Sequence, residues 1–88
     1  MKKFECMIGD PLGIHARTVA AMAVEAGKHA CSIVIRAGEG SAEVTDMIGV
    51  MGLSIGYGQT VTLEFEGAQE DAAVEGLRSV LTASWEEK

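Results

Sequence analysis

The chain has 88 residues, of which 48% are hydrophobic, and its formal net charge at pH 7 is −6. This length suits one hydrophobic core, so we expect residues 1–88 to form a single domain. The negative charge argues against nucleic acid as a partner, because binding to a phosphate backbone needs a basic surface. The two lysines near the start are not followed by the apolar run of a secretory signal, and no apolar stretch is long enough to span a bilayer.

The two cysteines, Cys6 and Cys31, belong to different strand-like segments and form no Cys-x-x-Cys motif. Together with the two histidines they give no spacing that is typical of metal ligands. We therefore expect buried free thiols, no metal site, and a reducing compartment such as the cytoplasm.

The spacing of apolar residues predicts the order strand, helix, strand, strand, helix, strand, helix. The strands are expected at residues 3–8, 31–37, 41–45 and 60–66, and the helices at residues 16–27, 47–53 and from 70 onward. Gly27 marks the end of the first helix, and Gly38-Glu39-Gly40 predicts a hairpin turn between the second and third strands. This order suits an α+β domain whose helices cover one face of a mostly antiparallel sheet.

His15 lies at or just before the first turn of the first predicted helix, after the turn signal Gly9-Asp10-Pro11. The first amide groups of a helix have no partner inside it, and the helix dipole is positive there. Such an end binds anions and favours the neutral imidazole over its protonated form. Arg17 adds a cation whose planar fork suits phosphate oxygens. These residues predict a phosphate-handling site, although a histidine near a helix start is more often a cap or a surface residue.

Asp46 is a good N-cap for the short helix that follows it. Apolar residues occupy positions 47, 48, 50, 51 and 53, which is more than one face of a short helix can bury. Either all of them belong to the core, or some of Met47, Ile48 and Met51 form an exposed surface that binds a partner. The sequence leaves both alternatives open.

Several segments occur together in one order: Gly13-Ile14-His15-Ala16-Arg17, then Met47-Ile48-Gly49-Val50-Met51 with Leu53, then Gly58, Glu66-Gly67 and residues 70–77. With these segments the chain resembles the HPr family over essentially its whole length. HPr proteins are the histidine-containing phosphocarriers of the bacterial phosphoenolpyruvate-dependent sugar phosphotransferase system. The resemblance implies an open-faced β-sandwich of order βαββαβα, in which a four-stranded antiparallel sheet carries three helices on one face.

The resemblance also implies a function. His15 would accept a phosphoryl group at Nδ1 from phospho-Enzyme I and pass it to Enzyme IIA domains. Arg17 and the amides of Ala16 and Arg17 would bind the phosphoryl group. The docking surface shared by these partners would comprise Ala20, Ala21, Val24, Met47, Ile48 and Met51. Such a carrier is a monomeric substrate of other enzymes rather than an enzyme, it needs no cofactor or metal, and a transcriptional regulator is a further candidate partner.

Two departures from the family's usual pattern matter, and a third, Gln69 in place of the usual aspartate after Gly67, is expected to have little effect. Thr18 replaces a proline that is favoured in a first helical turn because its φ is preset, so we expect His15 to be held less rigidly. Asp46 replaces a serine that a kinase phosphorylates in many Gram-positive relatives. Asp46 is either a plain N-cap or a partial phosphoserine mimic, with one negative charge against about −1.5 to −2 for a phosphate.

The Asp46 substitution leaves a second function open, a regulatory binding module of the same fold in which Asp46 holds the docking surface in a signalling form. A third alternative, a small-ligand sensor of similar α+β layout, requires a concave pocket, and nothing in the sequence marks one.

Overall fold

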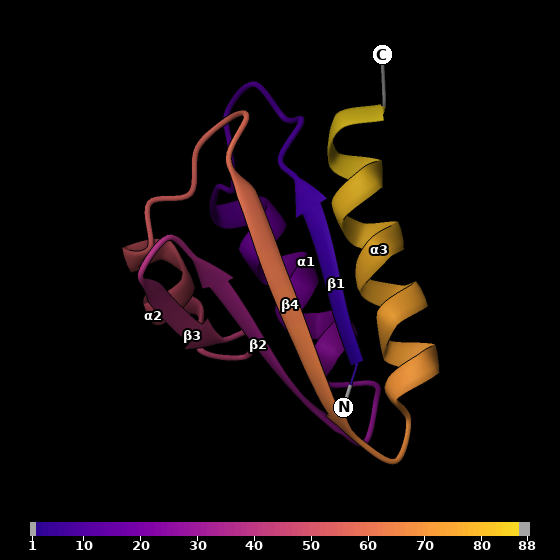
Figure 1. Ribbon diagram of the computed structural model, residues 1–88. Helices are drawn as coiled ribbons and strands as arrows, with labels where there is room; N and C mark the ends of the chain where they lie inside the picture. The colour runs from indigo at the N-terminus through magenta and orange to yellow at the C-terminus, as the bar shows by residue number, and fades with distance from the viewer. Residues whose placement is uncertain (1, 87–88) are drawn as a thin grey trace.

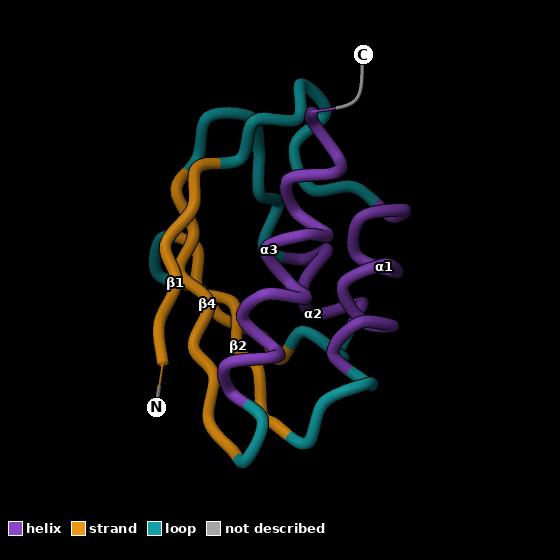
Figure 2. Tube along the Cα trace, turned by 90° about the vertical axis from the view of Figure 1, so that its right-hand side faces the viewer, coloured by secondary structure: helices purple, strands orange, loops and turns teal. Residues whose placement is uncertain are grey.

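The computed structural model describes residues 2–86, with the side chains of residues 2–81. Its elements follow the order βαββαβα (Figure 1): β1 Lys2–Met7, α1 Ala16–Ala26, β2 Cys31–Ala37, β3 Gly40–Glu43, α2 Met47–Gly52, β4 Thr60–Gly67 and α3 Glu70–Glu86. The strands form one antiparallel sheet in the order β1-β4-β2-β3. Figure 2 shows the helices together on one side of this sheet. The predicted fold class is therefore confirmed, and no helix of the described residues is long and apolar enough to cross a membrane.

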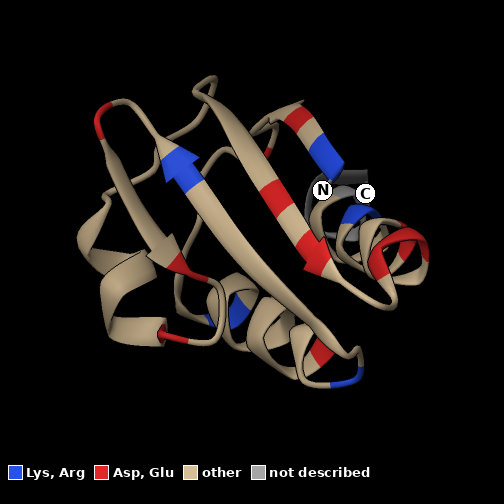
Figure 3. Ribbon diagram, turned by 60° about the horizontal axis from the view of Figure 1, so that its bottom comes forward, with Lys and Arg blue, Asp and Glu red and all other residues tan. Residues whose placement is uncertain are grey.

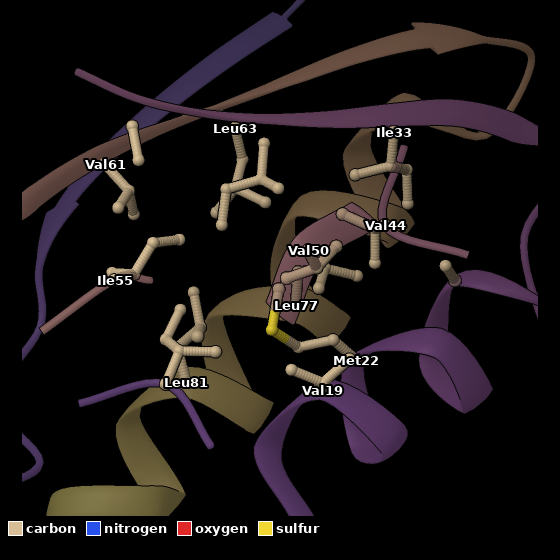
Figure 4. Close-up of a cluster of buried hydrophobic side chains, with 14 of the residues drawn as sticks. Val19, Met22, Ile33, Val44, Val50, Ile55, Val61, Leu63, Leu77 and Leu81 are labelled. Carbon is tan, nitrogen blue, oxygen red and sulfur yellow. The ribbon is translucent and has the colours of Figure 1, made fainter. Parts of the chain in front are cut away.

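The core lies between the sheet and the helices, as Figure 4 shows. Val61, Leu63 and Phe65 alternate along β4 and are almost completely buried, because the period of two places every second side chain on the helix-covered face. The helices meet them with an equally buried set of side chains: Val19 and Met22 from α1, Val50 from α2, and Leu77 and Leu81 from α3. Each of these apolar side chains contributes roughly 1.5–3 kcal/mol of stability by its burial, and together they hold the three helices against the sheet.

The other face of the sheet is open and polar. Arg36 on β2 donates a hydrogen bond to Glu64 on β4 at 2.9 Å, and the Lys3 ammonium lies 3.9 Å from the same carboxylate. Basic and acidic positions are interspersed over the fold, including this open face (Figure 3). Charged side chains of β1, β2 and β4 therefore meet on the open face.

Two expectations needed correction. The third strand is Gly40–Glu43 rather than residues 41–45, because its register with β2 ends where Glu43 pairs with Val34 and the chain then turns at Val44. The Val44 amide still donates to the Ile33 carbonyl at 2.9 Å. Cys6 and Cys31 are free thiols, as predicted, but they are only partly buried. They lie on the edge strand β1 and at the first residue of β2, where cover is incomplete. Even so, partial burial raises the pKa of both thiols above the ordinary value.

Two loops at one end of the sheet are tied together. The loop from β1 to α1 meets the loop from α2 to β4, since the Ile14 amide donates to the Ile55 carbonyl at 3.0 Å and the Gly58 amide donates to the Ile8 carbonyl at 2.8 Å. Gly13 has a φ of +70°, and a Cβ there would lie 2.5 Å from the Ile55 carbonyl oxygen. Glycine at this position allows the close approach of the two loops.

We predict that Gly13→Ala lowers the free energy of unfolding by roughly 2–4 kcal/mol, because a left-handed φ costs about 1–2 kcal/mol and the new methyl group also displaces backbone. Gly38→Ala is the matched control, since Gly38 has a φ of +61° and a methyl group there would meet nothing within 4 Å. The control should lose only the conformational cost. Urea unfolding of both variants measures the difference. Equal losses of unfolding free energy in Gly13→Ala and Gly38→Ala would contradict the claim that Gly13 is needed for the close approach of the two loops.

Candidate functional site

His15 is the N-cap residue of α1. Its backbone is extended, with φ −121° and ψ 179°, and its carbonyl accepts the first intrahelical hydrogen bond from the Val19 amide at 2.9 Å. The amides of Ala16 and Arg17 precede this bond, so they have no acceptor inside the helix. The His15 side chain makes no capping bond to them. The helix start predicted from the sequence is therefore present, with open amide donors next to the imidazole.

The imidazole of His15 is anchored through one of its two nitrogens. Nε2 lies 3.1 Å from Oδ2 of Asp10 and 3.3 Å from Oγ1 of Thr18. No hydrogen bond from a described residue reaches Nδ1. The side chain of His15 is 25% exposed, whereas that of Asp10 is 8% exposed. The ring is thus held at Nε2 by two buried residues, while the side chain as a whole stays partly exposed and no described residue bonds to Nδ1.

Asp10 is a residue of this site that the sequence pattern marks only as part of a turn. Its Oδ1 accepts a hydrogen bond from the Leu12 amide at 2.9 Å, and its carbonyl accepts one from the Gly13 amide at 2.8 Å. These bonds curl the loop so that the carboxylate turns back toward His15. An acidic residue five positions before a histidine at a helix start is the only signal in the sequence, and its meaning depends on the path of this loop.

Arg17 and Thr18 follow His15 with different surroundings. Arg17 is exposed, and no described residue forms an ion pair with it. Its guanidinium is therefore available to an anion bound at the helix start. Thr18 is buried, and its hydroxyl contacts the His15 ring, an interaction that proline at this position could not make.

An exposed apolar surface lies beside the start of α1, on α1 and α2. Val50 of α2 is buried, whereas Ile48 of the same helix is 86% exposed. Of the two alternatives left open by the sequence, the exposed surface is the one that the structure has. All six residues of the predicted docking surface are at least partly exposed: Ala20, Ala21, Val24, Met47, Ile48 and Met51.

Two further apolar side chains near His15 were not predicted. Leu12 is 76% exposed in the loop before His15, and Tyr57 is 69% exposed in the loop that the Ile14–Ile55 hydrogen bond ties to it. No local pattern distinguishes these two side chains from the neighbouring Ile14 and Ile55, which are buried. Leu12 and Tyr57 are thus exposed apolar side chains on the two loops that are hydrogen-bonded to each other.

Asp46 caps α2. Its side chain accepts a hydrogen bond from the Gly49 amide at 3.1 Å, and its carbonyl accepts one from the Val50 amide at 3.0 Å. A Cβ on Gly49 would lie 2.5 Å from Oδ2 of Asp46, so glycine leaves room for the carboxylate. The N-cap that the sequence predicted is present, and it places a negative charge at one end of the docking surface.

Among the described side chains, those of residues 2–81, no three His, Cys, Asp or Glu residues are grouped so that they could hold a metal ion. The same part of the chain encloses no pocket of the kind that a small-ligand sensor would need.

Comparison with known proteins agrees with this geometry. The family described as "PTS HPr component phosphorylation site" matches residues 2–83. The phosphocarrier protein HPr of Lysinibacillus sphaericus is 40% identical over 82 residues, which cover 93% of each chain. The solved structure of a Mycoplasma histidine-containing phosphocarrier protein superposes with a TM-score of 0.90 at 30% identity, covering 98% of this chain and 100% of its own. HPr-C-His of Thermoanaerobacter tengcongensis superposes with a TM-score of 0.91 at 26% identity, covering 100% and 99%.

Fold and comparisons together define the class as a phosphocarrier of the phosphotransferase system, which is not a catalytic enzyme. The chain belongs to the HPr family, and the resemblance found in its sequence is confirmed.

Proposed function

We propose that His15 accepts a phosphoryl group at Nδ1 from phospho-Enzyme I and passes it to Enzyme IIA domains in phosphoenolpyruvate-dependent sugar uptake. The observation that carries this proposal is the imidazole at the start of α1, which is anchored through Nε2 and open at Nδ1. A phosphoryl group on Nδ1 would lie near the free amides of Ala16 and Arg17, where the helix dipole favours an anion. The exposed Arg17 guanidinium would add a charge-assisted hydrogen bond.

Both partners would bind the docking surface in turn. Its position beside His15 would bring a partner's reacting atom in line with Nδ1, and positioning supplies most of the catalysis in phosphoryl transfer. Apolar side chains held in solvent on a small protein are typical of a binding site, and methionines adapt to partners of different shape. One surface can therefore serve both the donor and the acceptor.

We predict that incubation with phosphoenolpyruvate, Mg²⁺ and purified Enzyme I adds one acid-labile phosphoryl group, seen by mass spectrometry. His15→Ala should abolish the addition. His29→Ala is the matched control, because His29 is the other histidine of the chain and is paired with Glu25 at 2.8 Å. Acid-labile phosphate on His15→Ala, or its loss from His29→Ala, would overturn the assignment of His15.

A second prediction concerns the docking surface. Ile48→Ser should raise the KM for Enzyme I roughly 10- to 100-fold, because loss of an isoleucine contact that is buried in the complex is worth roughly 1.5–3 kcal/mol. The free energy of unfolding should hardly change, since Ile48 is 86% exposed. Met7→Ser is the control, since Met7 is exposed on β1 and points opposite to the buried Ile8. Equal KM values for Ile48→Ser and Met7→Ser would show that Ile48 is not part of the surface that binds Enzyme I.

Asp46 is the observation behind one alternative function, a regulatory binding module whose docking surface is held in a signalling form. Its carboxylate lies at the start of α2, next to Met47 and Ile48. Because the same carboxylate also caps the helix, a plain structural role accounts for the residue.

We predict that Asp46→Ser leaves the rate of phosphorylation by Enzyme I unchanged, because serine also caps a helix and removes only the charge. Asp46→Ala should lower the free energy of unfolding by about 0.5–2 kcal/mol, which reports the cap itself. A marked gain in rate for Asp46→Ser over the natural protein would instead support the phosphoserine mimic and the regulatory function.

A further inference from the structure

The surroundings of Nε2 define which ring nitrogen of His15 holds a proton. An ionised carboxylate has only acceptors, and Oδ2 of Asp10 lies 3.1 Å from Nε2. The other oxygen of the same carboxylate accepts a hydrogen bond from the Leu12 amide, so both oxygens act as acceptors. A neutral ring therefore makes this hydrogen bond only when Nε2 carries the proton, and the lone pair is then on Nδ1.

We propose that Asp10 is a positioning residue that holds His15 in the tautomer protonated at Nε2, and so directs the lone pair of Nδ1 to the incoming phosphoryl group. This inference rests on the proposed function of His15 as phosphoryl acceptor. Thr18 does not fix the tautomer, because its hydroxyl, 3.3 Å from Nε2, can donate or accept. Of the described residues that contact the ring, only Asp10 must act as a hydrogen-bond acceptor.

The transfer step shows what this arrangement contributes. The lone pair of Nδ1 forms a bond to phosphorus while the bond from phosphorus to the donor's leaving atom breaks, and its electron pair stays on that atom. Nε2 keeps its proton, so the ring becomes cationic as the N–P bond forms. The Asp10 carboxylate faces that cation at hydrogen-bond distance and stabilises it, without itself taking up the proton. Transfer to an acceptor is the same step in reverse.

A purely structural role for Asp10 would also be consistent with its bond to the Leu12 amide. Asp10→Asn separates the two roles. Its amide oxygen can still accept from Leu12, whereas its NH₂ group, turned to His15, can only donate. The NH₂ group favours a lone pair on Nε2 and hence a proton on Nδ1.

The test reads the tautomer and the reaction separately. Ring ¹⁵N chemical shifts of the neutral imidazole should show Nε2–H in the natural protein and a shift of population toward Nδ1–H in Asp10→Asn. Phosphorylation by Enzyme I should become roughly 10- to 100-fold slower in that variant, by analogy with the loss of a residue that orients a metal-ligating histidine. Glu39→Gln is the matched control, a carboxylate-to-amide change in the exposed β2–β3 turn.

A structural role alone would leave the tautomer of Asp10→Asn unchanged, and that result overturns the proposal whatever happens to the rate. A changed tautomer with an unchanged rate also overturns it. If neither protein accepts phosphate while their tautomers differ as predicted, the proposed function fails and the positioning by Asp10 stands. Should Asp10→Asn not fold, Asp10→Ser keeps an acceptor for the Leu12 amide and removes the charge, and the same two readouts apply.

Discussion

The position of His15 depends on the backbone hydrogen bond from the Ile14 amide to the Ile55 carbonyl. This bond joins the loop before α1 to the loop after α2, although the two are far apart in the sequence. It bonds the residue before His15 to a residue just after α2, and so links the start of α1 to the helix that carries Met47, Ile48 and Met51. Gly13 is needed there because any Cβ would meet the backbone of the other loop. One close approach of two chain segments therefore connects both halves of the proposed site, the imidazole of His15 and the exposed apolar surface of α1 and α2.

The negative and positive groups around the His15 ring lie on different sides of it. Asp10 is buried behind Nε2, whereas the open amides of α1 and the exposed Arg17 lie on the side of the helix start. A phosphoryl dianion on Nδ1 would be repelled by Asp10, yet the ring between them becomes cationic and is closer to the carboxylate than the phosphate is. At short range the attraction to the ring outweighs the repulsion, because Coulomb energy falls with distance. An acidic protein can thus accept a phosphoryl group, since the local arrangement matters more than the net charge of −6.

The features that could be predicted from the sequence are those that depend on local patterns. Strand alternation, the turn signals and the helix start at Ala16 indicated the fold and placed His15 as the N-cap of α1. Asp10 was not predicted, because its contact with His15 depends on how five residues of loop curl. The exposure of Met47, Ile48 and Met51 could not be decided either, since it depends on which face of α2 meets the core. The partial exposure of the cysteines likewise depends on how far the sheet edges are covered.

The most direct test of this account is to determine which nitrogen of His15 carries the phosphoryl group. Long-range ¹H–¹⁵N correlation spectra of the phosphorylated, ¹⁵N-labelled protein identify the bonded nitrogen by its chemical shift. We expect phosphate on Nδ1, the nitrogen that no described residue contacts, with Nε2 remaining bound to Asp10. Phosphate on Nε2 would contradict the account, because the ring would then have to leave the Asp10 carboxylate and turn its other edge to solvent.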